Sequence, residues 1–216
     1  MYLPPFEELE KASKEELLKI IRGTKSKLTR LRNKMEHPDY KNRTVWVYPS
    51  DDVIYKCDRD FLDRAIIKYL EKGGEYKFSK IELKDMDFND KLEKISKITF
   101  TNGGFFEVEQ KTVVTLIENE VKVETGSFGD LVPFDIGYDK VNFLNELGRL
   151  HIGEWRKHYK PDRFGICILD GEQWSLEIEY KDGKKKEYSG SNAYPYNYED
   201  LISLLGLDIQ PQVEEC

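Results

Sequence analysis

The segment Trp174–Tyr180 constrains the fold of this chain more than any other part. Its residues alternate strictly: Trp174, Leu176, Ile178 and Tyr180 are apolar or aromatic, and Ser175, Glu177 and Glu179 are polar. Because successive side chains of a strand point to opposite faces, this period predicts a strand with one buried face and one face in solvent. Asp182-Gly183 follows, and such a dipeptide favours the tight turn of an antiparallel hairpin. We therefore expect an antiparallel sheet that packs on one side.

The rest of the C-terminal half predicts further elements around this hairpin. Apolar pairs separated by turn signals at residues 102–104 and 118–120 indicate an antiparallel meander: Ile98 with Phe100, Phe106 with Val108, Val114 with Leu116, and Val121 with Val123. More strands are expected over residues 131–136, 165–169 and 185–188, with Asp170-Gly171 as a second hairpin signal. Apolar spacing over residues 141–155 predicts one or two helices, and Asn197 is expected to cap a closing helix.

The N-terminal part begins with a well-marked helix. Ser13, followed three residues later by Glu16, is a capping box, and it predicts a basic amphipathic helix over about residues 14–36. Apolar residues recur along this helix at steps of three and four and form one narrow seam, which includes Leu17, Leu28 and Leu31. Such a seam favours packing against a partner helix, either in this chain or in a second subunit.

Together these elements predict an α+β fold. Residues 1–92 are expected to form a helical region, with a second helix over about residues 58–72 and a third over about residues 80–91, where Ser79 repeats the capping pattern. Residues 93–216 are expected to form a mainly antiparallel sheet with packed helices. A chain of 216 residues can bury a substantial core without metals or disulfides.

The cysteines and the N-terminus indicate the compartment. The chain has three cysteines, Cys57, Cys167 and Cys216, with no CxxC spacing, which favours reduced thiols. The N-terminus lacks the basic and apolar regions of a signal peptide, and no apolar run approaches the roughly 18 residues of a membrane span. We therefore expect a cytoplasmic protein with no membrane partner.

The first helix concentrates positive charge in a chain whose net charge is -7. The whole-chain charge argues against general affinity for nucleic acid, but a local basic face can override such an average. The candidate phosphate contacts are Lys19, Arg22, Lys25, Arg30 and Lys34. An acidic partner protein, or the acidic remainder of this chain, would satisfy the same charges equally well.

The most enzyme-like constellation lies between residues 151 and 158. If this segment is a single helix, His151, Glu154 and His158 share one face that could hold a metal ion. The spacing matches no zinc-protease signature, and Gly153 weakens the helix. No phosphate-binding loop, dinucleotide fingerprint or nucleophile elbow is present, and no cofactor is expected. The favoured interpretation is a helix with exposed polar residues and Trp155 in the core.

A tyrosine-rich rim spans residues 188–198. It contains Tyr188, Tyr194, Tyr196 and Tyr198, and it also contains Pro195. Tyrosine combines a large apolar ring with a hydroxyl group and is enriched at protein interfaces. The rim is therefore a candidate contact surface. Alternatively, some of these rings cover the sheet where the chain crosses to the closing helix.

The same C-terminal stretch resembles a module that recurs in uncharacterised bacterial proteins. The resemblance rests on Ile168-Leu169-Asp170-Gly171, Trp174-Ser175-Leu176-Glu177-Ile178, Gly190-Ser191-Asn192-Ala193-Tyr194-Pro195 and Leu201 to Gly206. The segments around Met35-Glu36-His37-Pro38, Pro49-Ser50 and Gly73-Gly74-Glu75-Tyr76 are similar to the same group. The resemblance implies a coherent bacterial protein and brings no known activity or site residue.

Three functions remain open at this point. The leading hypothesis is a non-enzymatic protein-binding module, including an inhibitor or immunity-type protein, with a partner or a second copy at the seam of the first helix and a contact surface at the tyrosine rim. The first alternative is a nucleic-acid-associated protein that uses the basic helix. The second is a metal-dependent enzyme.

Overall fold

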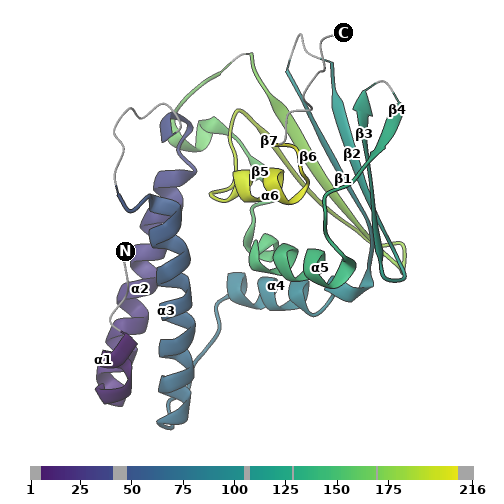
Figure 1. Cartoon of the computed structure of the whole chain (residues 1–216). Coiled ribbons are helices and arrows are strands. Elements are labelled where there is room, and N and C mark those ends of the chain that lie inside the picture. Colours follow the sequence, from purple (N-terminus) through teal and green to yellow (C-terminus); the bar gives the residue numbers. More distant parts are fainter. Residues whose placement is uncertain (1–5, 41–47, 105–107, 128, 169, 209–216) are drawn as a thin grey trace. The chain divides into compact units, whose positions relative to one another are not determined.

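The computed structural model describes residues 6–40, 48–104, 108–127, 129–168 and 170–208. The chain divides into two compact units, Met1–Phe78 and Ser79–Cys216. The expected α+β class is confirmed: helices precede a seven-stranded, mostly antiparallel sheet (Figure 1). Among the described helices, none combines the length and the apolar character needed to cross a bilayer.

The first unit contains α1 (Phe6–Lys11), α2 (Lys14–Met35), the 3-10 helix η1 (Pro38–Tyr40) and α3 (Asp51–Glu71). The capping box of α2 is confirmed, because the hydroxyl of Ser13 accepts a hydrogen bond from the Glu16 amide and the Glu16 carboxylate accepts one from the Ser13 amide. α3 begins at Asp51 and not near residue 58. Its first turn carries acidic side chains, which the positive end of the helix dipole stabilises.

α2 and α3 pack against each other in antiparallel directions. Three contacts define their register: Lys34 Nζ lies 2.6 Å from Asp51 Oδ2, Lys27 Nζ lies 2.7 Å from Asp58 Oδ2, and Lys14 Nζ donates to the Gly73 carbonyl oxygen at 2.9 Å. In the apolar seam, Leu17 and Leu28 are buried and Leu31 is half-buried. The partner helix that the seam predicted is therefore α3 of the same chain.

The second unit is built on one sheet with the strand order β4-β3-β2-β1-β6-β7-β5. The strands are β1 (Ile95–Gly103), β2 (Gln110–Ile117), β3 (Glu120–Ser127), β4 (Asp130–Phe134), β5 (His158–Tyr159), β6 (Gln173–Tyr180) and β7 (Lys185–Ser191). Neighbouring strands are antiparallel except β5 and β7, which are parallel. The predicted strand at residues 131–136 corresponds to β4. Of the predicted pair Phe106 and Val108, Phe106 lies outside the described residues and Val108 belongs to no strand.

Three helices cover one face of this sheet: α4 (Lys80–Asn89), α5 (Lys140–Arg149) and α6 (Tyr198–Leu204) (Figure 1). Short 3-10 helices lie between the longer elements: η2 (Leu92–Lys94), η3 (Ile152–Glu154) and η4 (Pro161–Phe164). The core joins Phe100, Leu176 and Ile178 of the sheet to Phe88 of α4 and Phe143 of α5. The alternation along β6 is confirmed, since its even-numbered residues are buried and its odd-numbered ones are not. The opposite face of β6 is polar.

Only one of the two expected hairpin turns is present. Asp182-Gly183 lies in the turn that joins β6 to β7, where the Gly183 amide donates to the Tyr180 carbonyl oxygen and Gly183 has a positive φ of 79°. Asp182 does not have a positive φ, so the turn is a three-residue loop with glycine in the left-handed position and not the expected two-residue turn. Asp170-Gly171 is not a hairpin turn, because no strand is found in residues 165–168. Instead, Pro161 opens η4, and Gly165 ends it in the left-handed conformation. The prediction of a strand over residues 165–169 is therefore wrong for its described residues.

Asn197 precedes α6 as predicted, but its side chain does not cap the helix. Its amide nitrogen donates to the Leu150 carbonyl oxygen at 2.6 Å, and its amide oxygen accepts from the Trp155 indole nitrogen at 3.0 Å. Both contacts are buried. Asn197 therefore joins the start of α6 to the segment that follows α5, where unpaired polar groups would be costly.

α4 belongs to the second unit, although we expected it to end a helical region over residues 1–92. The reason is a close backbone contact with η3. A Cβ atom added to Gly153 would lie 2.5 Å from Asp85 Cα and 2.7 Å from the Lys84 carbonyl oxygen. Only glycine fits at this contact without a shift of the backbone, so α4 and η3 are held at a fixed spacing.

Substitution Gly153→Ala tests this contact. The added methyl group must push η3 away from α4, and we expect the second unit to lose about 1–3 kcal/mol of its free energy of unfolding. Urea unfolding followed by the fluorescence of Trp155 and Trp174 measures the loss. Gly23→Ala is the control, because Gly23 lies inside α2 with open space around it. That change is expected to stabilise the first unit by about 0.5–1 kcal/mol. An unchanged unfolding midpoint for Gly153→Ala would contradict the account.

Candidate functional site

A row of polar side chains crosses the sheet on the face opposite the core. Thr101 of β1 pairs with Ser175 of β6, Ser175 pairs with Ser189 of β7, and Ser189 pairs with His158 of β5. Paired residues of neighbouring strands project to the same face, so these four side chains lie side by side across four strands. Two hydrogen bonds connect them in pairs. Thr101 Oγ1 and Ser175 Oγ are 2.7 Å apart, and His158 Nδ1 and Ser189 Oγ are 2.9 Å apart.

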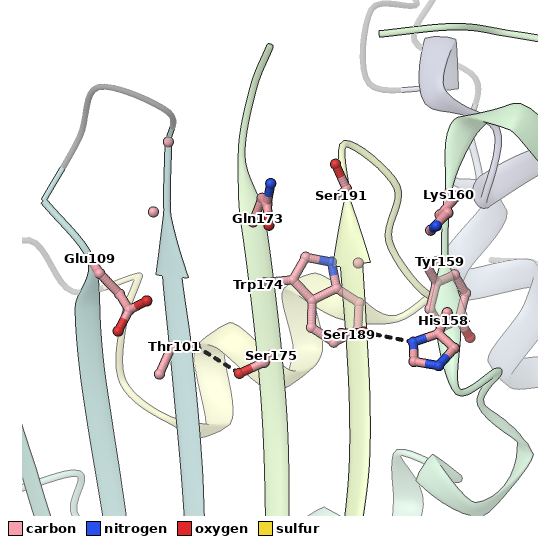
Figure 2. Close-up of a pocket in the computed structure, with 13 residues that line it drawn as sticks. Thr101, Glu109, His158, Tyr159, Lys160, Gln173, Trp174, Ser175, Ser189 and Ser191 are labelled. Atoms are coloured by element: carbon pink, nitrogen blue, oxygen red, sulfur yellow. Dashed lines mark hydrogen bonds between the residues drawn. The ribbon is translucent and has the colours of Figure 1, made fainter. Parts of the chain in front are cut away.

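This row forms the floor of a cleft of about 490 Å³. The small side chains in the row and at Gly103, Gly104 and Ser191 leave the hollow open, because larger residues would fill it. Figure 2 shows Glu109 at one end of the cleft and His158 with Lys160 at the other, with the hydroxyl groups between them. The volume lies in the range of sites that hold small ligands or short segments of a partner.

The pair of Ser189 and His158 is the closest approach to a nucleophile and its base in this cleft. Covalent catalysis by serine normally needs a third group that orients the imidazole. Among the described residues, the polar contact of His158 is with Ser189. The geometry therefore provides hydrogen-bond donors and acceptors for a ligand, and it does not assemble a triad.

The three residues predicted to share a metal-binding face do not do so. Residues 151–158 are not one helix: His151 has the left-handed backbone conformation, η3 spans only three residues, and His158 lies in β5. The predicted helix does not form, because α5 ends at Arg149 and the chain then turns back so that η3 packs on α4. His151 and Glu154 remain together, but His158 belongs to the cleft.

A residue that the sequence did not reveal completes the group around His151 and Glu154. Asp85 of α4 places its Oδ2 atom 2.6 Å from His151 Nδ1, and its side chain is only 6% exposed. One candidate ligand atom from each of Asp85, His151 and Glu154 lies within 4.8 Å of the others. Asp85 precedes His151 by more than sixty positions in the chain, so no local spacing could have indicated this neighbour.

The tyrosine rim is divided between core and surface. Tyr188 and Tyr198 are each 5% exposed and contact the buried aromatic residues Trp155 and Trp174, respectively. A partner could not reach these two rings without rearranging the core. Tyr194 and Tyr196 are half-buried, and the Tyr194 hydroxyl donates to Glu172 Oε2 at 2.6 Å. The alternative that some rings cover the sheet therefore accounts for Tyr188 and Tyr198.

The candidate phosphate contacts on α2 include residues that are paired within the first unit and residues that are exposed. Lys34 pairs with Asp51, and Lys25 Nζ lies 3.0 Å from the Tyr76 hydroxyl, so α3 and the segment after it engage two of the five candidate phosphate contacts. The other three, Lys19, Arg22 and Arg30, are exposed. The acidic remainder of the first unit thus satisfies part of the charge of α2.

The chain matches no protein-family model, no curated protein and no solved structure. The resemblance of the C-terminal stretch to a bacterial module therefore stays a prediction.

Burial of the tyrosine rings predicts a loss of stability in alkali. Burial raises the pKa of Tyr188 and of Tyr198 well above the ordinary value of 10.0. Since the unfolded chain releases these protons first, their contribution is fully present below about pH 10 and is lost as pH rises above it. We expect the free energy of unfolding to fall by up to about 1.4 kcal/mol per pH unit for each ring.

Urea unfolding at pH values from neutral to alkaline measures this fall. The double variant Tyr188→Phe and Tyr198→Phe is the control, because it retains the buried rings and has no proton to lose there. Its stability should decline less steeply above pH 10 than that of the wild type. Equal slopes for the two proteins would contradict the assignment.

Proposed function

We propose that this chain is a non-enzymatic protein-binding module whose cleft holds an extended polar segment of a partner protein. The observation that carries the proposal is the row of Thr101, Ser175, Ser189 and His158 on the polar face of the sheet. An inhibitor or immunity-type protein that blocks a partner by holding one of its loops is one form of this function. The free thiol of Cys167 supports the cytoplasm as its compartment.

The chemistry of the cleft suits a peptide backbone. A hydroxyl group both donates and accepts hydrogen bonds, so the row can match the alternating N–H and C=O groups of an extended segment. Neighbouring strands are about 4.8 Å apart, so β1 and β5 lie about 14 Å apart across three spacings. An extended chain advances about 3.4 Å per residue, and about four residues would span that distance.

The charges at the two ends of the cleft favour one orientation of a bound segment. Glu109 favours a positive group of the ligand at one end, while Lys160 favours a negative group at the other. A segment with a basic residue at one end and an acidic residue at the other therefore fits best. Exposed charges of this kind contribute more to specificity than to affinity.

The cleft replaces the N-terminal seam as the proposed contact surface. Leu17 and Leu28 are buried, and α3 of the same chain packs along α2, so little of the seam remains for a second subunit. Leu31, which is half-buried, is the member of the seam with the most exposed surface among those we predicted. Self-association through this helix therefore has little support.

A displayed library of random peptides provides the test. Peptides enriched on the full chain are expected to bind wild-type protein and to bind the variant Ser175→Tyr at least tenfold more weakly, because the new ring fills the middle of the cleft. Thr99→Tyr is the matched control. Thr99 lies on the same polar face of β1 as Thr101, and it does not line the cleft. Its dissociation constants should equal those of the wild type.

Two results would contradict the proposal. One is a set of peptides that bind wild type and Ser175→Tyr equally. The other is failure of the wild type to enrich any peptide over Ser175→Tyr. Circular dichroism of each variant shows whether the fold is retained, so that a loss of binding is assigned to the cleft.

A second candidate function rests on the exposed stripe of α2. Lys19, Arg22 and Arg30 are exposed, and residues 17–35 contain no Asp or Glu. We propose as the alternative that this stripe contacts the phosphates of a nucleic acid. Such binding releases counterions and weakens steeply as salt is raised.

Titration of DNA and RNA oligonucleotides at several salt concentrations tests this alternative. Lys19→Glu, Arg22→Glu and Arg30→Glu combined should abolish binding. The control combines Lys80→Glu, Lys111→Glu and Lys122→Glu, which changes the net charge equally at exposed positions of the second unit. This control should retain most of the affinity. Absence of wild-type binding at low salt would eliminate the alternative.

A further inference from the structure

We infer that Asp85, His151 and Glu154 form a binding site for a divalent first-row transition metal ion. The site is separate from the cleft residues, and it does not depend on the proposed protein-binding function. It draws one ligand from α4 and two from the turn that follows α5. All three residues belong to the second unit.

The backbone holds the two sides of this site at a fixed spacing. Gly153 lies between His151 and Glu154, and its Cα faces the backbone of α4 at Asp85 so closely that a side chain has no room. Ile152 and Phe88, which are fully buried, belong to the same core. The carboxylate of Asp85 and the two ligands on the turn therefore face each other without any loop having to close.

His151 is placed by an uncommon backbone conformation. Its φ of 48° and ψ of 42° lie in the left-handed region, which few residues other than glycine adopt. This conformation lets the chain reverse between α5 and η3 with the imidazole directed at Asp85. The ring is 24% exposed and Asp85 is 6% exposed, so the site has a buried side and a side open to solvent.

The ligand set is typical of zinc and manganese sites. One imidazole nitrogen and two carboxylate oxygens are ligands that these ions accept at about 2.0–2.2 Å. Two ligands of one tetrahedral centre are then about 3.4 Å apart. The present atoms lie within 4.8 Å of one another, so rotation of the side chains can bring them into range. Three protein ligands leave at least one position for water.

The charges of the group also favour a cation. Two carboxylates share a small and partly buried space, and like charges at such distances repel. A hydrogen bond joins His151 Nδ1 to Asp85 Oδ2, and binding of a metal ion would displace the proton of this hydrogen bond. Lys186 lies close enough to Asp85 for their charges to interact, so it offsets part of this negative charge.

Calorimetric titration of the full chain, stripped with a chelator, tests the site with Zn²⁺ alone and with Mn²⁺ alone. Wild-type protein is expected to bind one ion per chain. Glu154→Gln should raise the dissociation constant at least tenfold, and since Glu154 is half-buried this variant should fold normally. His151→Gln should have a similar effect. The matched control is His158→Gln, which removes the histidine in the cleft and should leave metal affinity unchanged.

The visible absorption of bound Co²⁺ provides a second measurement, because it reports the ligands of the ion directly. Its spectrum should change in Glu154→Gln and stay the same in His158→Gln. The inference is overturned if the wild type binds neither Zn²⁺ nor Mn²⁺ stoichiometrically, or if Glu154→Gln binds as tightly as the wild type. In that case Asp85 and His151 only connect α4 to the turn. Peptide binding in the cleft would be unaffected by that result.

Discussion

The second unit depends on the pairing of β1 with β6. This pairing joins the meander of β1 to β4 with the hairpin of β6 and β7, which lie far apart in the sequence. It places Phe100 opposite Leu176 in the core and Thr101 opposite Ser175 on the polar face. A shift of one residue would exchange the two faces of one strand, bringing polar side chains into the core. The core and the cleft are therefore specified by one register, and a shift of that register would disrupt both together.

The features that the sequence predicted well depend on residues close together in the chain. Ser13 and Ser79 each accept from the amide three residues later, so both helix starts could be recognised from four consecutive residues. The alternation of β6 and the turn at Asp182-Gly183 are equally local. The α+β class followed from these signals because period and turn chemistry distinguish helices from strands without knowledge of tertiary contacts.

The features that the sequence did not predict depend on distant residues. Asp170-Gly171 has the composition of a hairpin turn, yet Gly171 faces the side chain of Asn192, whose amide accepts from the Glu172 backbone. Asp85 reaches His151 only because α4 packs on η3. The cleft was also hidden, since serine and threonine on the polar side of a strand are ordinary and become a row only through pairing. The helix that covers the apolar seam on α2 could not be identified from the sequence either, because a seam does not indicate which helix packs against it.

The central claim is that the row across β1, β6, β7 and β5 holds a partner segment, and amide hydrogen exchange of the full chain with and without a bound peptide tests it most directly. The account predicts slower exchange at residues 101–104, 173–175 and 189–191 on binding, where the backbone borders the cleft. Exchange in α2 should stay unchanged. Protection confined to α2, or to the helices on the opposite face of the sheet, would contradict the claim.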